Sequence, residues 1–423
     1  MTARRFQADV PAVPPRILLL LPSTTYQAGA FLAAAGRLGA LVTVGTDHGS
    51  VFDGEQPANL LSLDFKSPAD VTRRVVAFAL EHPIAAVMGV DDLTAVLAAD
   101  VARALGLVHA DPAACEAARD KHRQRVLLEA AGQQVPAFEL VRFDEDHARR
   151  ARDLPYPCVV KPLTLSMSRG VMRVDTPAAY PMAVERLRRI VLAAGATADA
   201  FLVERFVAGP EFAVEALLLD GQLETLAVFQ KPDPLDGPYF AETIYATPCA
   251  LGHAEEQRVV DCVRGAAHAI GLTRGPVHAE VRLNKDGAWL VELAARPIGG
   301  KCAAVLRFGR AGEESLEQLL LRAALGRWER DSAGAITREP GGVAVYMIPV
   351  PRAGTLRAVH GLEAARSVGD VDDIVITAHV GQALQPLPEG NRYLGFIFAR
   401  AAFAEDAIAA VRQAHAKLVF ELA

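Results

Sequence analysis

One segment of the sequence is especially informative about the fold: His278-Ala-Glu280-Val-Arg-Leu-Asn284-Lys-Asp-Gly287, followed by Val291-Glu292-Leu-Ala-Ala-Arg296-Pro-Ile-Gly-Gly300. Between two apolar runs, Asn-Lys-Asp-Gly predicts a hairpin turn that joins antiparallel strands. If Asp-Gly closes the turn, Glu280 and Glu292 project from neighbouring strands to the same face. Two carboxylates so close together need a cation, and ligation by oxygen alone points to Mg²⁺, with Mn²⁺ as an alternative, rather than zinc.

Arg296 and the two glycines that follow it come directly after the second strand. The arginine is a fixed cation at the mouth of the predicted site, and Gly299 and Gly300 let a ligand approach the backbone. The alternative is that both carboxylates are exposed and that Arg296 is only their surface partner. Apolar neighbours argue against it because they indicate a buried sheet: Val281, Leu283, Leu290 and Leu293.

Lysine is scarce in this chain, with seven among the forty-four basic residues. Lys161 ends the apolar run Cys158-Val-Val, and a loop containing Ser166, Ser168 and Gly170 follows. A lysine at a strand end, beside a loop rich in hydroxyls and backbone N–H groups, can hold phosphate oxygens. The alternative is a lysine that points to solvent before an ordinary hairpin loop.

A connector between two predicted strands carries a second cluster of polar residues, Glu204-Arg205-Phe206-Val207, with Glu211 after it. The backbone of such a connector can pair with a planar base, while carboxylates meet its amino group and the ribose hydroxyls. The alternative, an edge strand with protective charges, is the commoner meaning of Glu-Arg at a strand end.

The composition is that of a folded chain: 423 residues, 51% hydrophobic and 22% charged, with a net charge of −6. The charge excludes global attraction to nucleic acid or to an anionic membrane. Five scattered cysteines without CxxC spacing argue against disulfides and zinc and favour a reducing interior. The apolar run 17–21 is too short for a signal peptide or a membrane span, so we expect a cytoplasmic protein.

The pattern of apolar and polar residues changes twice along the chain, and the three parts predict α/β and α+β domains. Residues 1–111 alternate apolar strands with helical patterns, which predicts a Rossmann-like, doubly wound parallel sheet without the GxGxxG fingerprint. Residues 112–340 combine a helix over 112–131 with short, turn-bounded strands and hold the predicted site. Residues 341–423 predict a small α+β domain, either a lid over an acceptor pocket or a dimer surface. In the first domain, Ser23-Thr-Thr25 is expected to cap a helix that runs to about Gly36.

In this order and spacing, the segments resemble the ATP-grasp superfamily, especially its L-amino-acid ligase type of carboxylate–amine ligase. The resemblance implies a pre-ATP-grasp domain, an ATP-grasp domain of two α+β subdomains and a C-terminal domain, and it covers about residue 93 to the end. It implies ATP as the nucleotide, small carboxylic acids and amines or amino acids as substrates, and amide-bond formation through an acyl phosphate. Family members are often homodimers, which the sequence does not decide.

The resemblance also assigns roles to individual residues. Nucleotide binding falls to Lys121 of the pair Asp120-Lys121, and to Lys161, Ser166, Ser168, Glu204, Arg205, Phe206, Val207 and Glu211. Metal binding falls to Glu280 and Glu292. Arg296 and Lys161 are the expected catalytic residues. Substrate binding is expected of Glu242, Tyr245, His278, Arg296, Gly299 and Gly300.

Ala294 departs from the resemblance, because many ATP-grasp enzymes carry asparagine at this position, two residues after the second glutamate. Two further hypotheses therefore stay open. One keeps the fold but makes the protein a carboxylase or a purine-pathway-like enzyme that uses bicarbonate or formate. The other is a nucleotide-binding module without catalysis, which Ala294 supports and which Glu280, Glu292 and Arg296 together oppose.

Overall fold

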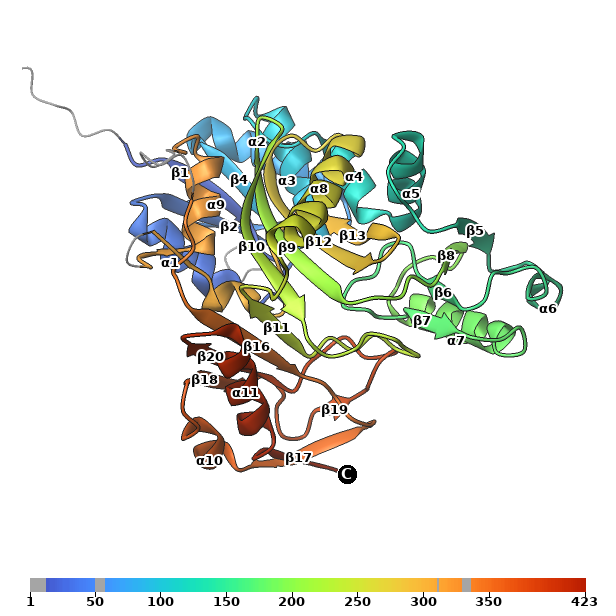
Figure 1. Ribbon diagram of the computed structural model, residues 1–423. Helices are drawn as coiled ribbons and strands as arrows, with labels where there is room; N and C mark the ends of the chain where they lie inside the picture. Colours follow the sequence, from blue (N-terminus) through green and yellow to red (C-terminus); the bar gives the residue numbers. More distant parts are fainter. Residues whose placement is uncertain (1–12, 50–57, 310–311, 329–335) are drawn as a thin grey trace, which may run out of the picture.

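The computed structural model describes residues 13–49, 58–309, 312–328 and 336–423, and its lobes surround one large sheet (Figure 1). The N-terminal lobe is a parallel sheet with the strand order β3-β2-β1-β4. Its central strand β1 is apolar after the first residue and fully buried there, because helices cover both faces of the sheet. The lobe comprises β1 (Arg16–Leu20), α1 (Ala28–Arg37), β2 (Leu41–Thr46), β3 (Leu60–Ser62), α2 (Pro68–Glu81), β4 (Ala86–Gly89) and α3 (Asp92–Ala104).

The predicted Rossmann-like sheet is confirmed, but the predicted helix cap in it is wrong. Helix α1 begins at Ala28, and its N-cap Gln27 makes no side-chain capping hydrogen bond. The Thr25 hydroxyl instead accepts the N–H of Gln27 at 3.2 Å, and the Thr25 N–H donates to Pro22 at 2.9 Å. The hydroxyl is thus used in a turn that precedes the helix.

The helix predicted over 112–131 is also wrong, since the chain forms two helices, α4 (Pro112–Arg119) and α5 (Lys121–Ala130). Asp120 between them has extended backbone angles (φ −94°, ψ 110°), and its carboxylate accepts the N–H of Arg123 at 2.9 Å. Asp120 is therefore the N-cap of α5. The break makes Lys121 the first residue of a new helix, beside the central cavity.

A small lobe follows, built on an antiparallel sheet with the order β5-β8-β6-β7. Helix α7 packs on one face of this sheet, where the side chains of Tyr180 and Leu187 are fully buried. The elements are β5 (Phe138–Arg142), α6 (His147–Arg150), β6 (Cys158–Lys161), β7 (Met172–Val174), α7 (Tyr180–Ala193) and β8 (Ala200–Arg205).

The large sheet has the order β13-β12-β9-β10-β11-β16-β20-β18 and is antiparallel throughout. Both predicted hairpin turns, at 220–221 and 284–287, are present in it. Helices α8 and α11 cover it in separate hydrophobic clusters. The elements are β9 (Glu211–Leu219), β10 (Gln222–Lys231), β11 (Ile244–Thr247), α8 (His253–Ala269), β12 (Gly275–Asn284), β13 (Gly287–Ala294), β16 (Gly342–Ile348), β18 (Val371–Ile376), β20 (Gly395–Ala401) and α11 (Ala404–His415).

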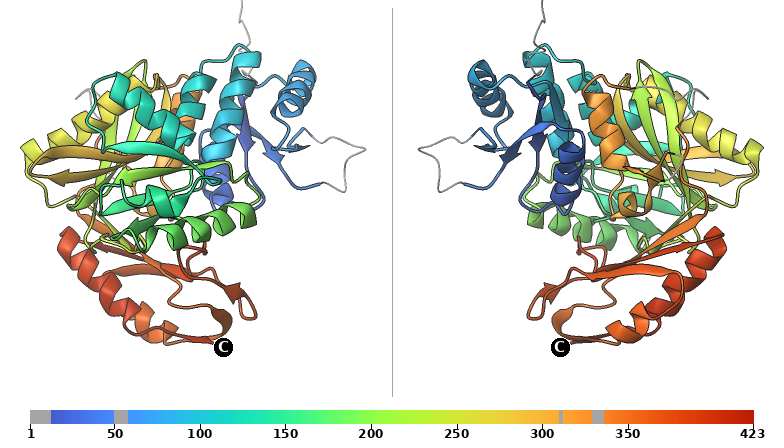
Figure 2. Two further views of the ribbon diagram at one scale, coloured as in Figure 1. Left: turned by 90° about the vertical axis from the view of Figure 1, so that its right-hand side faces the viewer. Right: turned by 90° about the vertical axis from the view of Figure 1, so that its left-hand side faces the viewer.

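The C-terminal segment is continuous with the large sheet, because β16 pairs with β11 on one side and with β20 on the other. In the views of Figure 2 this segment lies beneath the small lobe, next to α7. The remaining elements are η1 (Cys302–Val305), β14 (Arg307–Phe308), β15 (Glu314–Ser315), α9 (Leu316–Ala324), β17 (Gly354–His360), α10 (Leu362–Arg366), β19 (Ala383–Leu384) and β21 (Val419–Leu422). No helix in the described part of the chain is long and apolar enough to cross a bilayer.

Candidate active site

A cleft of about 790 Å³ separates the small lobe from the large sheet. Its walls are the ends of β6 and β8 on one side and β9, β12 and β13 on the other. Most of the residues predicted to bind nucleotide or metal line this cleft: Lys121, Lys161, Ser168, Glu204, Arg205, Phe206, Val207, Glu211, Glu280 and Glu292, together with Glu242. The sequence prediction therefore selected residues that the fold does bring together.

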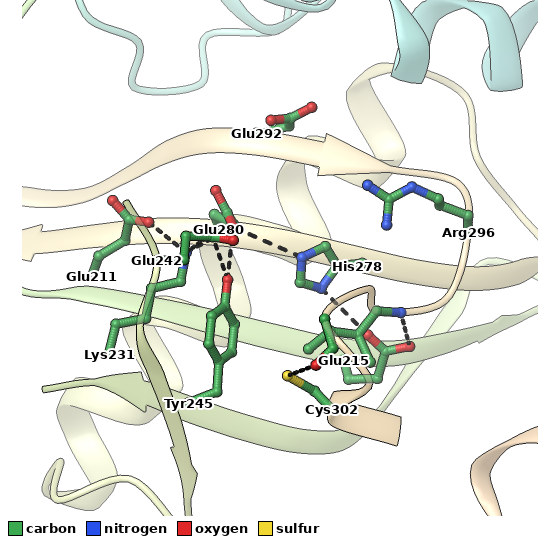
Figure 3. A network of polar contacts seen from close by, with 12 residues as sticks. Glu211, Glu215, Lys231, Glu242, Tyr245, His278, Glu280, Glu292, Arg296 and Cys302 are labelled. Atoms are coloured by element: carbon green, nitrogen blue, oxygen red, sulfur yellow. Dashed lines mark hydrogen bonds and ion pairs between the residues drawn. The ribbon is translucent and has the colours of Figure 1, made fainter. Parts of the chain in front are cut away.

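Glu280 and Glu292 stand directly opposite each other on β12 and β13, so they share one face of the sheet (Figure 3). Their side chains are 16% and 29% exposed, which excludes a pair of freely solvated carboxylates. A bulge follows Glu280, where Val281 pairs with Leu290 and Val291 is left over. The donor set is oxygen only and faces the cleft, so it fits Mg²⁺.

Lys121 is the cation that contacts the second carboxylate. Its Nζ lies 2.9 Å from Glu292 Oε1 and donates to the Leu165 carbonyl at 2.9 Å. Burial alone would raise the pKa of Glu292, but the charges of Lys121, Arg296 and Lys161 outweigh it and lower the pKa to about 2. Glu292 is therefore ionised at every physiological pH.

Lys161 forms a buried ion cluster with Glu204 and Arg125. Its Nζ lies 2.5 Å from Glu204 Oε2, while Arg125 Nε donates to Glu204 Oε1 at 2.6 Å and Arg125 Nη2 to the Val291 carbonyl at 2.7 Å. Burial lowers the pKa of Lys161 to about 8, against the attraction of Glu204 and with the repulsion of Arg125. Sequence reasoning missed Arg125, which has the appearance of an ordinary helix-surface charge.

Lys231 is the residue that sequence reasoning should have found. Its Nζ contacts three carboxylates, Glu211 at 2.7 Å, Glu242 at 2.8 Å and Glu280 at 2.7 Å, and Figure 3 shows them converging on it. Burial would lower the pKa of Lys231, but these carboxylates raise it well above its ordinary value. Lys231 is one of only seven lysines in the chain and stands at the end of the largely apolar strand β10. Its position is therefore a sequence signal of the same kind as that of Lys161.

The three carboxylates around Lys231 also have ligand atoms within 4.8 Å of one another. Glu280 therefore belongs to a cluster with Glu211 and Glu242, in addition to its predicted pairing with Glu292. Tyr245 donates its hydroxyl to Glu242 at 2.6 Å and lies 3.2 Å from Glu280 Oε1. Burial and the neighbouring Glu242 raise the pKa of Glu280, although Lys231 opposes them.

Phe206 is held in the connector by two guanidinium groups, with Arg173 at 4.3 Å and Arg282 at 5.1 Å from the ring centroid. Arg282 also donates to Glu211 Oε2 at 2.8 Å and to the Val207 carbonyl at 2.7 Å. The connector is therefore fixed before any ligand binds, and Arg205 at its start is exposed to solvent while lining the cleft.

The predicted phosphate loop contains two non-glycine residues in the left-handed region, Met167 (φ 59°) and Ser168 (φ 53°). Ser168 lines the cleft, whereas Ser166 is not among its lining residues. The loop is tied to the C-terminal segment, because the Gly170 N–H donates to the Pro388 carbonyl at 2.9 Å and Arg169 Nε to the Glu389 carbonyl at 3.1 Å.

Arg296 is not among the residues that line the cleft. Its Nε donates to Asp92 Oδ1 at 2.8 Å, a residue at the start of α3 in the N-terminal lobe that sequence reasoning missed. Burial would lower the pKa of Arg296, but Asp92 and Glu292 raise it, so the guanidinium stays charged. Its charge in turn helps to lower the pKa of Glu292.

The glycines after Arg296 differ in what they require. Gly300 has φ +59°, where a side chain is strained, and a Cβ there would also lie 2.3 Å from Met347 Sδ, so both backbone and packing favour glycine. A Cβ on Gly299 would lie 3.3 Å from the hydroxyl of Tyr26. Gly299 therefore faces the N-terminal lobe across a narrow gap.

His278 lies between two carboxylates. Its Nδ1 is 3.4 Å from Glu215 Oε2 and its Nε2 is 3.9 Å from Glu280 Oε1. The side chain of Glu215 is wholly buried, and its Oε1 accepts the N–H of Ile298 at 3.2 Å. Glu215, which sequence reasoning also missed, thus ties the loop after Arg296 to the large sheet.

The fold and the cleft together define the class: a nucleotide cleft between two α+β subdomains, behind a parallel N-terminal lobe, is the ATP-grasp arrangement. Residues 154–305 match the family model of the ATP-grasp domain, and residues 32–109 match that of the ATP-grasp N-terminal domain. Residues 346–423 match the L-amino acid ligase C-terminal domain 2. These models together match most of the chain, which therefore carries ATP-grasp domains followed by an L-amino acid ligase C-terminal domain.

Comparison with known proteins agrees. The crystal structure of an L-amino acid ligase from Bacillus licheniformis is 27% identical, covers 97% of this chain and 99% of its own, and superposes with a TM-score of 0.80. An alanine–anticapsin ligase of Bacillus subtilis is 26% identical over 55% of this chain and 53% of its own length. A D-alanine–D-alanine ligase B of Pseudomonas syringae pv. tomato is 29% identical over 48% of this chain and 62% of its own length. The chain thus matches under two thirds of either curated relative.

Proposed function

We propose that this protein is an ATP-dependent carboxylate–amine ligase, which joins an acid to an amine through an acyl phosphate and releases ADP and phosphate. The observation that carries the proposal is the facing pair Glu280 and Glu292 in one cleft with Lys121 and Lys161. The names of the relatives support it, since they are an L-amino acid ligase, an alanine–anticapsin ligase and a D-alanine–D-alanine ligase.

The cleft supplies cations where a triphosphate needs them. A carboxylic acid has no good leaving group, so ATP must first transfer its terminal phosphoryl group to the acid. Lys121 and Lys161 would bind phosphate oxygens and hold the phosphoryl group in line with the attacking carboxylate. Mg²⁺ (or Mn²⁺), held by Glu280 and Glu292, would supply further positive charge to the transferring phosphoryl group.

The amine then attacks the acyl carbon, and negative charge develops on the acyl oxygen. Arg296 is the group that stabilises it in this proposal, because its guanidinium stays charged and Asp92 fixes its direction. Glu242 and Tyr245 would receive the amine substrate, with the Glu242 carboxylate attracting its ammonium group and accepting the proton that the nitrogen must lose before it attacks. Phosphate leaves, and an amide or peptide bond remains.

Phosphate release measured with paired substrates tests the activity. We expect release only when ATP, a carboxylic acid and an amine or amino acid are all supplied, with the amide identified by mass spectrometry. Release that requires bicarbonate or formate would favour the carboxylase or purine-pathway-like alternative. ATP binding without release for any pair would favour the non-catalytic module that Ala294 suggested.

Arg296→Ala tests the assigned catalytic group. Removing an oxyanion partner costs roughly a hundredfold or more in rate. We therefore expect the variant to bind ATP normally, by fluorescent-nucleotide titration, and to turn over at about one hundredth of the rate or less. Arg357→Ala, which removes an exposed arginine outside the cleft, is the control and should turn over like the unmodified protein; an Arg296→Ala variant as active as this control contradicts the role.

A further inference from the structure

Tyr393 connects the C-terminal segment to the residues that would receive the amine. It lies two residues before β20, and Glu242 lies two residues before β11. Both strands pair with β16 in antiparallel fashion, so they run in the same direction and begin at the same edge of the large sheet. The tyrosine hydroxyl consequently lies 3.5 Å from Glu242 Oε2, across 151 positions of the sequence.

The two carboxylate oxygens of Glu242 have different partners. Oε1 accepts the Tyr245 hydroxyl at 2.6 Å and lies 2.8 Å from Lys231 Nζ, and both contacts are short (Figure 3). Oε2 faces the Tyr393 hydroxyl at 3.5 Å, which is too long for a strong hydrogen bond. Oε2 is therefore the oxygen that can still accept a strong hydrogen bond from an ammonium group.

Packing fixes the ring of Tyr393 in place. The ring lies 5.8 Å from that of Phe396, edge to face, and packs against the hydrophobic cluster that contains Tyr245. The backbone is held as well, because the Tyr393 carbonyl accepts the Thr377 hydroxyl at 3.1 Å. The phenol hydroxyl therefore approaches the carboxylate from a rigid support.

The phenol of Tyr393 keeps its proton. Burial raises its pKa well above the ordinary value, and the negative charge of Glu242 raises the pKa further. The hydroxyl is therefore a donor toward Oε2, while its own oxygen retains lone pairs that accept hydrogen bonds. A carboxylate oxygen and a phenol oxygen side by side are complementary to an ammonium group, which has only donors.

We propose that Tyr393 is a positioning residue for the amine substrate: it holds Glu242 Oε2 toward the substrate ammonium, so the amine site is complete only with the C-terminal segment in place. The inference rests on the proposed ligase function, in which Glu242 receives the amine. It adds a role for the C-terminal segment, which the sequence left open between a lid and a dimer surface.

Titration with L-alaninamide tests the inference, because this probe has an ammonium group and no carboxylate that could enter the acid site. Its binding is measured by calorimetry in the presence of ADP and Mg²⁺. We expect Tyr393→Phe to weaken L-alaninamide binding about fivefold, the scale of one hydrogen bond, and to leave ADP binding unchanged. Tyr346→Phe is the matched control, since the ring of this β16 tyrosine stacks on His415 at 4.4 Å, and it should change neither affinity.

A double variant separates positioning from a general structural effect. In a protein that already carries Glu242→Gln, Tyr393→Phe should weaken L-alaninamide binding much less, because the hydroxyl acts through this carboxylate. Equal losses in both backgrounds overturn the inference. Unchanged affinity in Tyr393→Phe alone, or no binding of L-alaninamide to the unmodified protein, also overturns it.

Phosphate release with paired substrates separates this failure from failure of the proposed function. With a pair that releases phosphate, Tyr393→Phe should raise the KM for the amine about fivefold and leave the KM for ATP unchanged. Release with an unchanged KM for the amine leaves the ligase and overturns the role of Tyr393. L-alaninamide binding that depends on Tyr393, with no release for any pair, leaves the ammonium site and refutes the ligase.

Discussion

Glu204→Gln perturbs the buried ion cluster that connects the two walls of the cleft. The carboxylate is 7% exposed and contacts two cations, Lys161 at 2.5 Å and Arg125 at 2.6 Å. Its neutral replacement leaves both cations buried without a counter-charge, which typically costs 3–5 kcal/mol, taken here as about 3 because the amide oxygen still accepts one hydrogen bond. The pKa of Lys161 should then fall below about 8, since Glu204 is the group that raises it.

Urea unfolding followed by tryptophan fluorescence measures the loss, because Trp289 lines the cleft and the chain has only two tryptophans. Several lobes make a single two-state fit inappropriate, so the first transition is compared between variants. Glu139→Gln is the matched control: its pair with Arg150 is 53% exposed on the glutamate side, and its loss should cost under about 1 kcal/mol. In a protein that already carries Arg125→Met, Glu204→Gln should lower the free energy of unfolding much less than it does in the unmodified protein. Losses in free energy that simply add in the double variant refute the cluster argument.

Three further expectations concern the same cleft. Burial lowers the pKa of Lys161 to about 8, so this lysine is about half protonated at pH 8 and almost fully protonated at pH 6.5. ATP binding should therefore take up roughly half a proton at pH 8 and almost none at pH 6.5. Calorimetry in buffers of different ionisation enthalpy measures the uptake, and equal uptake at both pH values contradicts the prediction. Arg186→Gln, which breaks a bidentate pair with Glu389 at 2.6 and 2.8 Å between the small lobe and the C-terminal segment, should raise the KM for ATP about two- to fivefold, and adding Glu389→Gln should change nothing more. Glu215→Ala should lower kcat about tenfold or more without weakening ATP binding, because the loop after Arg296 loses its hydrogen bond from Ile298. Glu215→Gln should recover part of kcat in steady-state kinetics, because its amide oxygen still accepts the Ile298 N–H. No recovery argues against a positioning role.

The local pattern predicted what local physics controls. The turn Asn284-Lys-Asp-Gly287 predicted the hairpin, but the register that it sets would pair Glu280 with Val291. The bulge after Glu280, which the sequence did not reveal, is what brings Glu280 opposite Glu292 on one face. The short apolar strand that ends in a polar residue predicted Lys161 from local pattern alone. The break at Asp120 was missed because the helical pattern continues on both sides, and only the cap distinguishes two helices from one.

Long-range partners could not be predicted in this way. Asp92 contacts Arg296 across 204 positions, and Arg125 contacts Glu204 across 79, so nothing near either residue in the sequence reports the other. The change in sequence pattern near residue 341 predicted a separate C-terminal domain, whereas β16 pairs directly with β11. The unpaired N–H and C=O groups at the edge of a sheet favour the addition of another strand, and composition does not reveal which strand will pair there. The acidic cluster around Lys231 arises only when β9, β10 and β12 lie side by side.

Charge balance in the cleft limits how a nucleotide can enter. Five carboxylates line it, and each has a cation within 3 Å; the carboxylates are Glu204, Glu211, Glu242, Glu280 and Glu292, and the cations are Lys121, Lys161, Lys231, Arg125 and Arg282. Arg205 also lines the cleft, so these described residues carry six positive and five negative charges, a small excess of positive charge. A triphosphate adds about four negative charges, which cannot all be matched by lysines that already hold carboxylates. Metal-free ATP should consequently bind far more weakly than ATP with Mg²⁺, and equal affinity in the presence of excess EDTA would show that Glu280 and Glu292 have a different purpose.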